Sequence, residues 1–213
     1  IKSGADVIKF QLYSGDTIVN KKISPDRNKH FKKFQLSKKQ HIELAKMCRK
    51  AGVQYNASIW NLEMISWVDK YLKFYKIGSG DLTAYPIISE FAKRGKPILL
   101  STGLSNLSEI KDTINYIKKV NPIYKKRDMI AIMQCTSMYP TEDTDVNLLV
   151  IDQFKKSFNY EVGYSHHSFG DLPLLIAYIK GANVLEFHFT DNKRRKFNYT
   201  NLKNTLLKAW EIL

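Results

Sequence analysis

Residues 95–109 read Gly-Lys-Pro-Ile-Leu-Leu-Ser-Thr-Gly-Leu-Ser-Asn-Leu-Ser-Glu and contain one complete transition from turn to strand to helix. Gly95 is able to take a positive φ after a preceding helix, and Pro97–Ser101 is a short, mostly apolar run. Asn106 with Glu109 three residues later forms the pattern of a helix capping box. This stretch therefore predicts a strand that leads into a helix, which is the repeating unit of β/α folds.

The same alternation of short β-rich runs and amphipathic stretches continues along the chain. It predicts strands near Asp6–Gln11, Gln54–Ile59, Phe74–Ile77, Pro97–Ser101, Met129–Cys135, Tyr160–Tyr164 and Asn183–Phe189. It predicts helices near Lys38–Lys50, Leu62–Tyr71, Tyr85–Lys93, Leu107–Val120, Leu148–Ser157, Leu172–Lys180 and Leu202–Ile212. Seven units, one fewer than eight, predict an α/β (β/α)8 TIM barrel whose first β/α unit is missing from this chain.

Residues 1–213 are accordingly expected to form a single barrel domain. An open, doubly wound sheet is the alternative, but that fold usually has a Gly-rich phosphate loop after its first strand, and none occurs here. The segment Leu12–Gln35 is the longest irregular stretch, and we expect it to be a mobile loop over a site.

The composition excludes several classes of protein. With 213 residues, 44% of them apolar, the chain is large enough for one well-cored domain and is neither disordered nor a small disulfide scaffold. No apolar run approaches the roughly 20 residues that cross a bilayer, and the first residues lack the pattern of a signal peptide. We therefore expect a cytoplasmic protein, in which Cys48 and Cys135 are small core residues.

The net charge of +14, from 34 basic and 20 acidic residues, raises the question of a polyanionic partner. The lysines are spread along most of the predicted helices, and dense runs occur only at Lys125–Arg127 and Lys193–Lys196. We expect neither a nucleic-acid nor a membrane partner. A small anionic substrate would be attracted by the same positive field.

In a barrel of this kind, catalytic groups lie at the carboxyl ends of the strands. On the last predicted strand, alternation places Glu186 and His188 on one face, and on the preceding strand it places Ser165 and His167 on one face, with His166 turned away. Neighbouring strands are about 4.8 Å apart, so the two inward histidines could share a divalent metal, with Glu186 as a ligand or as an indirect partner. The alternative for each histidine is a hydrogen-bonded core residue.

Other polar residues at the strand ends are suited to an anion. Lys9 and Gln11 share a strand face, and a lysine directed into a barrel needs an anion to offset its desolvation. Ser79 and Ser101 precede predicted helices and offer hydroxyl and amide donors for phosphate. Lys96 flanks its strand, where a solvated surface lysine is as consistent as a ligand-binding one.

Taken together, these segments resemble the barrel domain of the sialic acid (N-acetylneuraminate) synthase family, which includes the pseudaminic and legionaminic acid synthases. The resemblance covers about residues 4–191. It rests on the order and spacing of Lys9-Phe-Gln11, Lys76-Ile-Gly-Ser-Gly-Asp-Leu82, Lys96-Pro-Ile-Leu-Leu-Ser-Thr-Gly103, Cys135-Thr-Ser-Met-Tyr-Pro-Thr141, Val162-Gly-Tyr-Ser-His-His167 and Gly181-Ala-Asn-Val-Leu-Glu-Phe-His-Phe-Thr190.

The resemblance implies an enzyme of sialic-acid-type surface polysaccharide biosynthesis. Such an enzyme is a phosphoenolpyruvate-dependent transferase that forms a C–C bond. Carbon three of phosphoenolpyruvate attacks the aldehyde of an open-chain N-acetylated hexose similar to N-acetylmannosamine, which gives a nine-carbon 2-keto sugar acid and releases phosphate. A divalent metal, Mn²⁺ or Mg²⁺, polarises the aldehyde and positions a water. The full-length protein is expected to be a homodimer.

The resemblance also implies roles for single residues. The two metal ligands are His167 and His188, and the catalytic groups are Lys9, Glu186 and Tyr139. The substrate-binding residues are Lys9, Gln11, Ser79, Lys96, Ser101, Ser137, Tyr139 and Ser165. Hydroxyl and cationic donors are what a trianionic substrate requires.

The chain departs from the family pattern at several points. His166 replaces a more usual Asp, Phe187 a frequent Lys, and Ser137 an Asn of some members. The family's acidic residue on the first strand and its C-terminal antifreeze-like domain are absent, so this chain alone is expected to be inactive. Two alternatives remain: a related phosphoenolpyruvate-dependent, aldolase-like barrel acting on another aldose, and a barrel that binds without catalysis.

Overall fold

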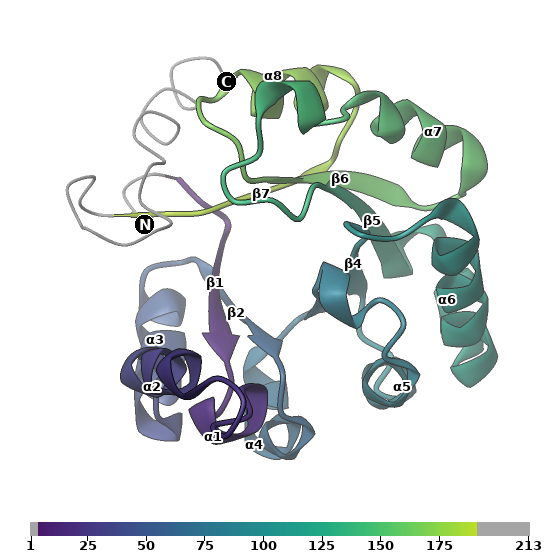
Figure 1. The fold of residues 1–213 in the computed structure, drawn as a ribbon. Coiled ribbons are helices and arrows are strands. Elements are labelled where there is room, and N and C mark those ends of the chain that lie inside the picture. The colour runs from purple at the N-terminus through teal and green to yellow at the C-terminus, as the bar shows by residue number, and fades with distance from the viewer. Residues whose placement is uncertain (1–3, 191–213) are drawn as a thin grey trace. The chain divides into compact units, whose positions relative to one another are not determined.

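The computed structural model describes residues 4–190, and it has two compact units divided after Lys76 (Figure 1). The predicted helix at Leu202–Ile212 lies outside the described residues. Within residues 4–190, no helix is both long enough and apolar enough to cross a membrane.

The first unit contains one parallel pair of strands joined through helices. Its elements are β1 (Val7–Leu12), α1 (Gly15–Ile18), α2 (Pro25–Phe34), α3 (Lys38–Lys50), β2 (Gln54–Ile59) and α4 (Ile65–Val68), with short 3₁₀ turns at Leu62–Met64 and Asp69–Tyr71. Strands β1 and β2 pair in parallel, with Lys9 opposite Asn56 and Gln11 opposite Ser58. The polar residues of the two strands are therefore neighbours on the same sheet.

Helix α3 occupies the residues that its sequence predicts. The Ser37 side chain accepts from the Gln40 amide and the Gln40 side chain accepts from the Ser37 amide, which completes a capping box. The helix buries His41, Ala45 and Cys48 along one face. Local capping and this apolar stripe fix both its start and its orientation.

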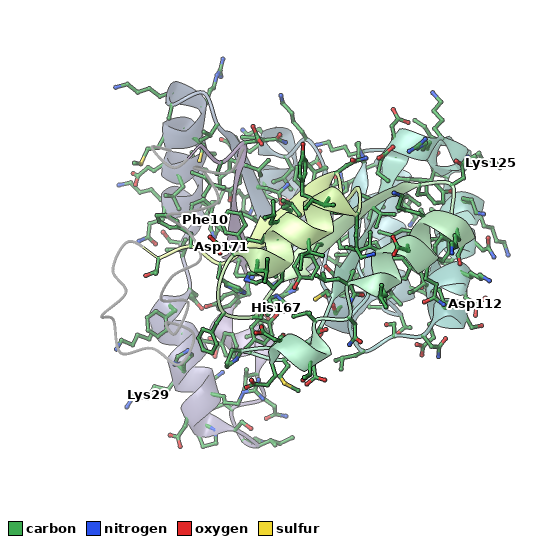
Figure 2. The ribbon with its side chains drawn as sticks, turned by 90° about the horizontal axis from the view of Figure 1, so that it is seen from above. Phe10, Lys29, Asp112, Lys125, His167 and Asp171 are labelled. Atoms are coloured by element: carbon green, nitrogen blue, oxygen red, sulfur yellow. The ribbon has the colours of Figure 1, made fainter. Side chains whose placement is uncertain are left out.

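The expectation of irregular structure at Leu12–Gln35 is wrong, because helices α1 and α2 occupy most of it. The amide of the buried Asn28 side chain donates to the carbonyl oxygens of Gly15 at 2.6 Å and Val19 at 3.0 Å. The outer side of α2 carries exposed side chains such as Lys29, which Figure 2 shows pointing outward from its helix.

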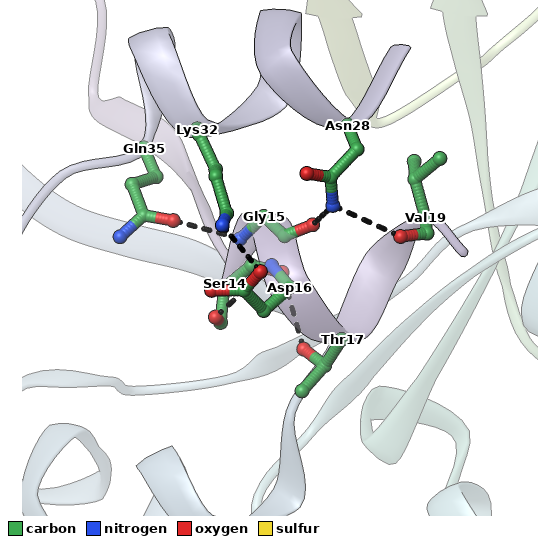
Figure 3. A network of polar contacts seen from close by, with 8 residues as sticks. All are labelled: Ser14, Gly15, Asp16, Thr17, Val19, Asn28, Lys32 and Gln35. Atoms are coloured by element: carbon green, nitrogen blue, oxygen red, sulfur yellow. Dashed lines mark hydrogen bonds and ion pairs between the residues drawn. The ribbon is translucent and has the colours of Figure 1, made fainter. Parts of the chain in front are cut away.

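The same segment is held by two further contacts (Figure 3). The Gly15 amide donates to Oε1 of Gln35 at 2.7 Å, and Lys32 forms an ion pair with Asp16 at 2.5 Å. A Cβ on Gly15 would lie 2.8 Å from the Lys32 backbone nitrogen, so only glycine allows α1 to pack this closely on α2. These contacts join residues that are not adjacent in the sequence, so the composition of the segment does not reveal them.

The second unit is built on a curled parallel sheet. The strands, in their spatial order, are β3 (Tyr75–Ile77), β4 (Ile98–Ser101), β5 (Ile130–Cys135), β6 (Glu161–His166) and β7 (Val184–Phe187). The second unit begins at Ile77, the last residue of β3. The helices are α5 (Tyr85–Lys93), α6 (Leu107–Val120), α7 (Leu149–Ser157) and α8 (Leu172–Ile179), which lie along the outer side of the sheet (Figure 1). Short 3₁₀ turns occur at Ser79–Asp81, Pro122–Lys125, Arg127–Met129 and Asp143–Asp145.

The sequence predicts this alternation because its boundaries are set locally. Asn106 and Glu109 form the predicted capping box at the start of α6. Gly95 and Gly181 have φ angles of 70° and 85°, in the left-handed region that favours glycine after a helix. The α/β class is therefore confirmed, with parallel pairing between the strands of the sheet.

Candidate active site

Three aromatic side chains of the second unit meet beyond the carboxyl ends of its strands. His167 directly follows β6 and His188 directly follows β7, and their ring centroids are 5.5 Å apart. The ring of Tyr139, in the loop after β5, lies 4.1 Å from the His167 ring and 5.7 Å from the His188 ring. Adjacent parallel strands thus bring together three residues that are well separated in the sequence.

The hydrogen bonding of His167 fixes its tautomer. Its Nδ1 lies 2.8 Å from the backbone carbonyl oxygen of Thr136, and a carbonyl can only accept, so Nδ1 carries the hydrogen. Burial lowers the pKa of His167 to about 4, so the imidazole is neutral near pH 7. Its Nε2 therefore presents a lone pair, and the Ser165 hydroxyl lies 3.5 Å from it.

A serine and a glutamate share the same edge of the sheet. Ser165 lies opposite Glu186 in the β6–β7 ladder, and its hydroxyl donates to Oε2 of Glu186 at 2.8 Å. Ser165 also lies opposite Cys135 in the β5–β6 ladder. The pairing between strands therefore positions the carboxylate of Glu186 beside His167.

Hydroxyl groups surround a close backbone approach at Gly103. The Gly103 amide donates to Oγ of Ser79 at 3.0 Å. A Cβ at this position would lie 2.4 Å from Oγ of Ser137 and 2.9 Å from Oγ of Ser79. Ser101, two residues earlier, is 2% exposed at the end of β4. Two predicted serines thus converge on one glycine that cannot carry a side chain.

Cys135 belongs to this site, a role that the sequence analysis did not assign. Its Sγ accepts from the Ser79 hydroxyl at 3.6 Å and lies 3.9 Å from Nδ1 of His167. The signal that could have identified it is its position as the last residue of a strand, immediately before Thr136 and Ser137.

His166 turns away from His167, as alternation along the strand predicts. Its Nδ1 is 3.4 Å from both the Tyr164 hydroxyl and the Ser168 hydroxyl, and the residue has no exposed surface. Burial lowers the pKa of His166, so this histidine is also held towards the neutral form. Its contacts are those of a core residue.

The first unit carries its own polar cluster on β1 and β2. Nζ of Lys9 donates to Oγ of Ser58 at 3.4 Å. The fully buried Asn56 donates to the Phe74 carbonyl oxygen at 3.0 Å, while its Oδ1 has no hydrogen-bond partner. Gln11, further along the same strand, is exposed. Gln11 therefore lies near the carboxyl end of β1, as predicted, whereas Lys9 lies in the middle of the strand.

Lys96 occupies a different position from the predicted serines. It precedes β4, at the amino end of the strand whose carboxyl end carries Ser101. Its backbone oxygen accepts from the Tyr124 hydroxyl at 2.6 Å. Lys96 and Ser101 therefore lie at opposite ends of β4.

Comparison with known proteins identifies the family. The model of the NeuB family matches residues 1–202. The chain belongs to the NeuB family.

Two curated relatives show the extent of the match. The chain is 33% identical over 204 residues to the N,N'-diacetyllegionaminic acid synthase of Campylobacter jejuni, covering 90% of this chain and 60% of the relative. It is 31% identical over 206 residues to the human N-acetylneuraminate-9-phosphate synthase, covering 91% of this chain and 56% of the relative. The chain thus spans little more than half the length of these NeuB relatives.

Solved structures agree on the fold. The N-acetylneuraminic acid synthetase of Leptospira borgpetersenii superposes with a TM-score of 0.86 at 24% identity, over 99% of this chain and 72% of that one. A truncated 3-deoxy-D-arabino-heptulosonate 7-phosphate synthase from Thermotoga maritima superposes with a TM-score of 0.73 at 15% identity, over 99% of this chain and 74% of that one. At these identities the likeness concerns the fold alone.

The NeuB family implies a divalent metal, and the two histidines have suitable chemistry for one. His167 is neutral and directs the lone pair of Nε2 away from its hydrogen-bonded Nδ1, as metal-bound imidazoles do. Across residues 4–190, no three His, Cys, Asp or Glu side chains form a metal-binding cluster. Two imidazoles would supply part of the ligand set of such a metal.

Proposed function

We propose that this chain supplies the catalytic barrel of a phosphoenolpyruvate-dependent synthase of nine-carbon sugar acids. The reaction joins carbon three of phosphoenolpyruvate to the aldehyde carbon of an N-acetylated hexose, consumes one water and releases phosphate. The observation that carries this proposal is the His167 and His188 pair beside the Ser165–Glu186 hydrogen bond. Membership of the NeuB family and the names of its relatives support a synthase of this class.

The hydroxyl groups around Gly103 are suited to the phosphate of phosphoenolpyruvate. The Ser79 and Ser137 hydroxyls lie close together beside the Gly103 backbone, so an anion bound next to them would meet several short donors. Ser101 is the third hydroxyl that we assign to this group. The roles of Lys9 and Lys96 towards the anionic substrate, and of Gln11 towards the sugar, rest in this proposal on the family resemblance alone.

The carboxylate of Glu186 would assist proton transfer during the condensation. The Ser165 hydroxyl donates to Oε2 of Glu186 and so orients the carboxylate, which would accept a proton or orient a water. Tyr139 packs against both imidazoles, where its hydroxyl would contact the sugar and its ring would exclude water.

His167 and His188 would hold Mn²⁺ or Mg²⁺, with the Thr136 carbonyl fixing the ring of His167. When bound, such a metal supplies Lewis-acid polarisation of the aldehyde oxygen. The protein's own contribution is a neutral imidazole at the required edge of the sheet, since burial opposes its protonation.

The larger architecture follows from the same proposal. The strands of residues 4–190 would belong to a (β/α)8 TIM barrel whose first β/α unit is not part of this chain. The complete protein would act as a homodimer in the cytoplasm.

The proposal is tested by titrating the metal-loaded protein with phosphoenolpyruvate in a calorimeter, because binding does not require turnover. We expect binding that weakens in Lys9→Ala and His188→Ala. Phosphate release with a panel of N-acetylated aldoses would then identify the acceptor. Binding that is the same in wild type and in both variants would contradict the assigned site, and phosphate release only with an aldose that lacks the N-acetyl group would favour a different condensing enzyme.

A further inference from the structure

The outer side of α2 and the turn before it form an exposed cationic surface that the proposed reaction does not use. We define the α2 surface as Lys21, Lys22, Ile23, Arg27, Lys29 and Lys33. All six side chains are exposed, and Asp26 is the one exposed acid among residues 20–34. The α2 surface therefore has five cationic side chains, and the same segment has one carboxylate. Helix periodicity places Lys29 and Lys33, four residues apart, on one face of α2, and Lys21 and Lys22 are adjacent in the turn before the helix.

The surface is presented by a rigid support. On its inner side, α2 is anchored by the Asn28 amide, the Lys32–Asp16 ion pair and the packing of Phe31 on Tyr13 at 5.3 Å between ring centroids. These contacts leave the outer face of the helix to Lys29 and Lys33, and Figure 2 shows Lys29 directed away from it. The helix that carries Lys29 and Lys33 is thus anchored to the rest of the first unit.

The α2 surface also contains one large apolar side chain, Ile23, which directly follows Lys21 and Lys22. Ile23 is 79% exposed. The backbone amides of Ile23 and Ser24 donate to the Asn20 carbonyl oxygen at 3.1 and 2.9 Å, so a hydrogen-bonded turn holds the residue in this position. A large exposed aliphatic group directly after two exposed lysines matches the pattern of proteins that rest on an anionic bilayer, with cations at the headgroups and the apolar group below them.

The aromatic rings of α2 argue against single-stranded nucleic acid as the occupant. Phe31 packs on Tyr13, and Phe34 packs against His30 at 4.8 Å and under Nζ of Lys33 at 5.4 Å. Stacking on bases needs an open ring face. Phe31 is only half-exposed, and Phe34, although 39% exposed, already has the His30 ring and the Lys33 ammonium against it. Four of the five cations are lysines, whose compact, strongly hydrated charges suit a headgroup layer better than bidentate phosphate recognition.

We infer that the α2 surface binds an anionic lipid bilayer peripherally, with Ile23 entering the headgroup layer. The absence of a spanning helix among residues 4–190 is compatible with this, since a surface-bound protein needs none. Peripheral attachment would bring the enzyme to a membrane without involving the residues of the proposed active site.

The test is sedimentation of the protein with vesicles made of two parts phosphatidylcholine and one part phosphatidylglycerol. We expect binding to these vesicles and not to pure phosphatidylcholine, with release as the salt is raised from about 0.1 M to about 1 M. K21Q/K22Q should weaken binding about 25-fold, because each lysine near an anionic leaflet contributes about fivefold. I23S should weaken binding without changing its dependence on salt.

The matched control is K125Q/K126Q, which removes the same charge from two exposed lysines of the second unit. It should change vesicle binding less than twofold, and circular dichroism should confirm that every variant is folded. The inference fails if K125Q/K126Q and K21Q/K22Q are equally impaired, if wild type does not sediment with the anionic vesicles, or if a single-stranded oligonucleotide binds the α2 surface more tightly than the vesicles do.

Discussion

The imidazole of His167 donates its Nδ1 hydrogen to the carbonyl oxygen of Thr136, over 2.8 Å. This bond joins the loop after β5 to the end of β6 and decides which nitrogen is free. Because the donor is fixed, the free Nε2 faces the Ser165 hydroxyl and not the protein backbone. A histidine held in this way resembles a metal ligand more than a titrating base.

Removing either histidine of the pair should weaken metal binding. We expect His167→Ala and His188→Ala each to lower the affinity for Mn²⁺ at least about tenfold, since each removes an imidazole donor. His166→Ala should leave the affinity nearly unchanged, because His166 contacts Tyr164 and Ser168 instead. Calorimetric titration with MnCl₂ measures all three, and equal losses in the three variants would show that the assumed strand faces are incorrect.

Gly103→Ala should damage both the stability and the anion site. Its Cβ would meet Oγ of Ser137 at 2.4 Å and the Cys135 carbonyl oxygen at 3.0 Å, so the loop must shift. We expect a loss of about 1–3 kcal/mol in the free energy of unfolding, together with weaker binding of phosphoenolpyruvate. Urea denaturation and calorimetry provide the two measurements.

The matched control is Gly80→Ala, where a Cβ would have no neighbour within 4 Å. It should change the free energy of unfolding by less than about 0.5 kcal/mol. If both alanine variants behave alike, the close approach at Gly103 has no energetic importance.

Asn28→Ala should release the α1–α2 segment. The change removes hydrogen bonds to the carbonyl oxygens of Gly15 and Val19 from a buried position, at a cost of about 1–3 kcal/mol. Amide hydrogens of residues 13–20 should then exchange faster with solvent, which mass spectrometry can follow. Lys29→Ala, on the exposed side of the same helix, is the control; unchanged exchange in Asn28→Ala would mean that other contacts hold the segment.

Acid should destabilise the protein through His41. Burial lowers the pKa of this histidine from 6.5, and its Nε2 has no hydrogen-bond partner, so the folded state favours the neutral ring. Because the unfolded chain then binds the proton more readily, the stabilising contribution is complete above about pH 6.5 and is lost as the pH falls below that value. The slope contributed by one such group cannot exceed about 1.4 kcal/mol per pH unit.

The measurement is urea denaturation of wild type and His41→Gln between pH 8 and pH 5. The difference in slope between the two proteins isolates His41 from the other histidines. An identical slope in wild type and His41→Gln would show that the His41 ring is protonated without penalty in the folded state.

Local signals predicted the regular elements well. Helices Lys38–Lys50, Tyr85–Lys93 and Leu107–Val120 begin and end where the sequence indicates, because caps and glycines act within a few residues. The segment Leu62–Tyr71 is instead split between α4 and two 3₁₀ turns. One contact that the sequence does not show is the hydrogen bond from the Tyr75 hydroxyl to the Asp69 carboxylate, which follows from the path of the chain after the helix.

The candidate site was predicted to the extent that strand alternation determines it. Alternation correctly separated His167 from His166, and parallel pairing correctly brought His167 close to His188. The role of Cys135 and the helical form of Leu12–Gln35 depend on contacts between distant residues, such as Cys135 with His167 and Asn28 with Gly15. Such contacts leave no periodic signal in a single sequence.

The pairing of Ser165 with both Cys135 and Glu186 has a consequence for how this protein can tolerate insertions and deletions. One residue added within Glu161–His166 would exchange the directions of His166 and His167, and His167 would lose its hydrogen bond to the Thr136 carbonyl oxygen. The same addition in the turn before β6 would be absorbed without reversing any side chain. Length changes in this chain should therefore accumulate in its turns, whereas the short strands must keep their residue count for the site to persist.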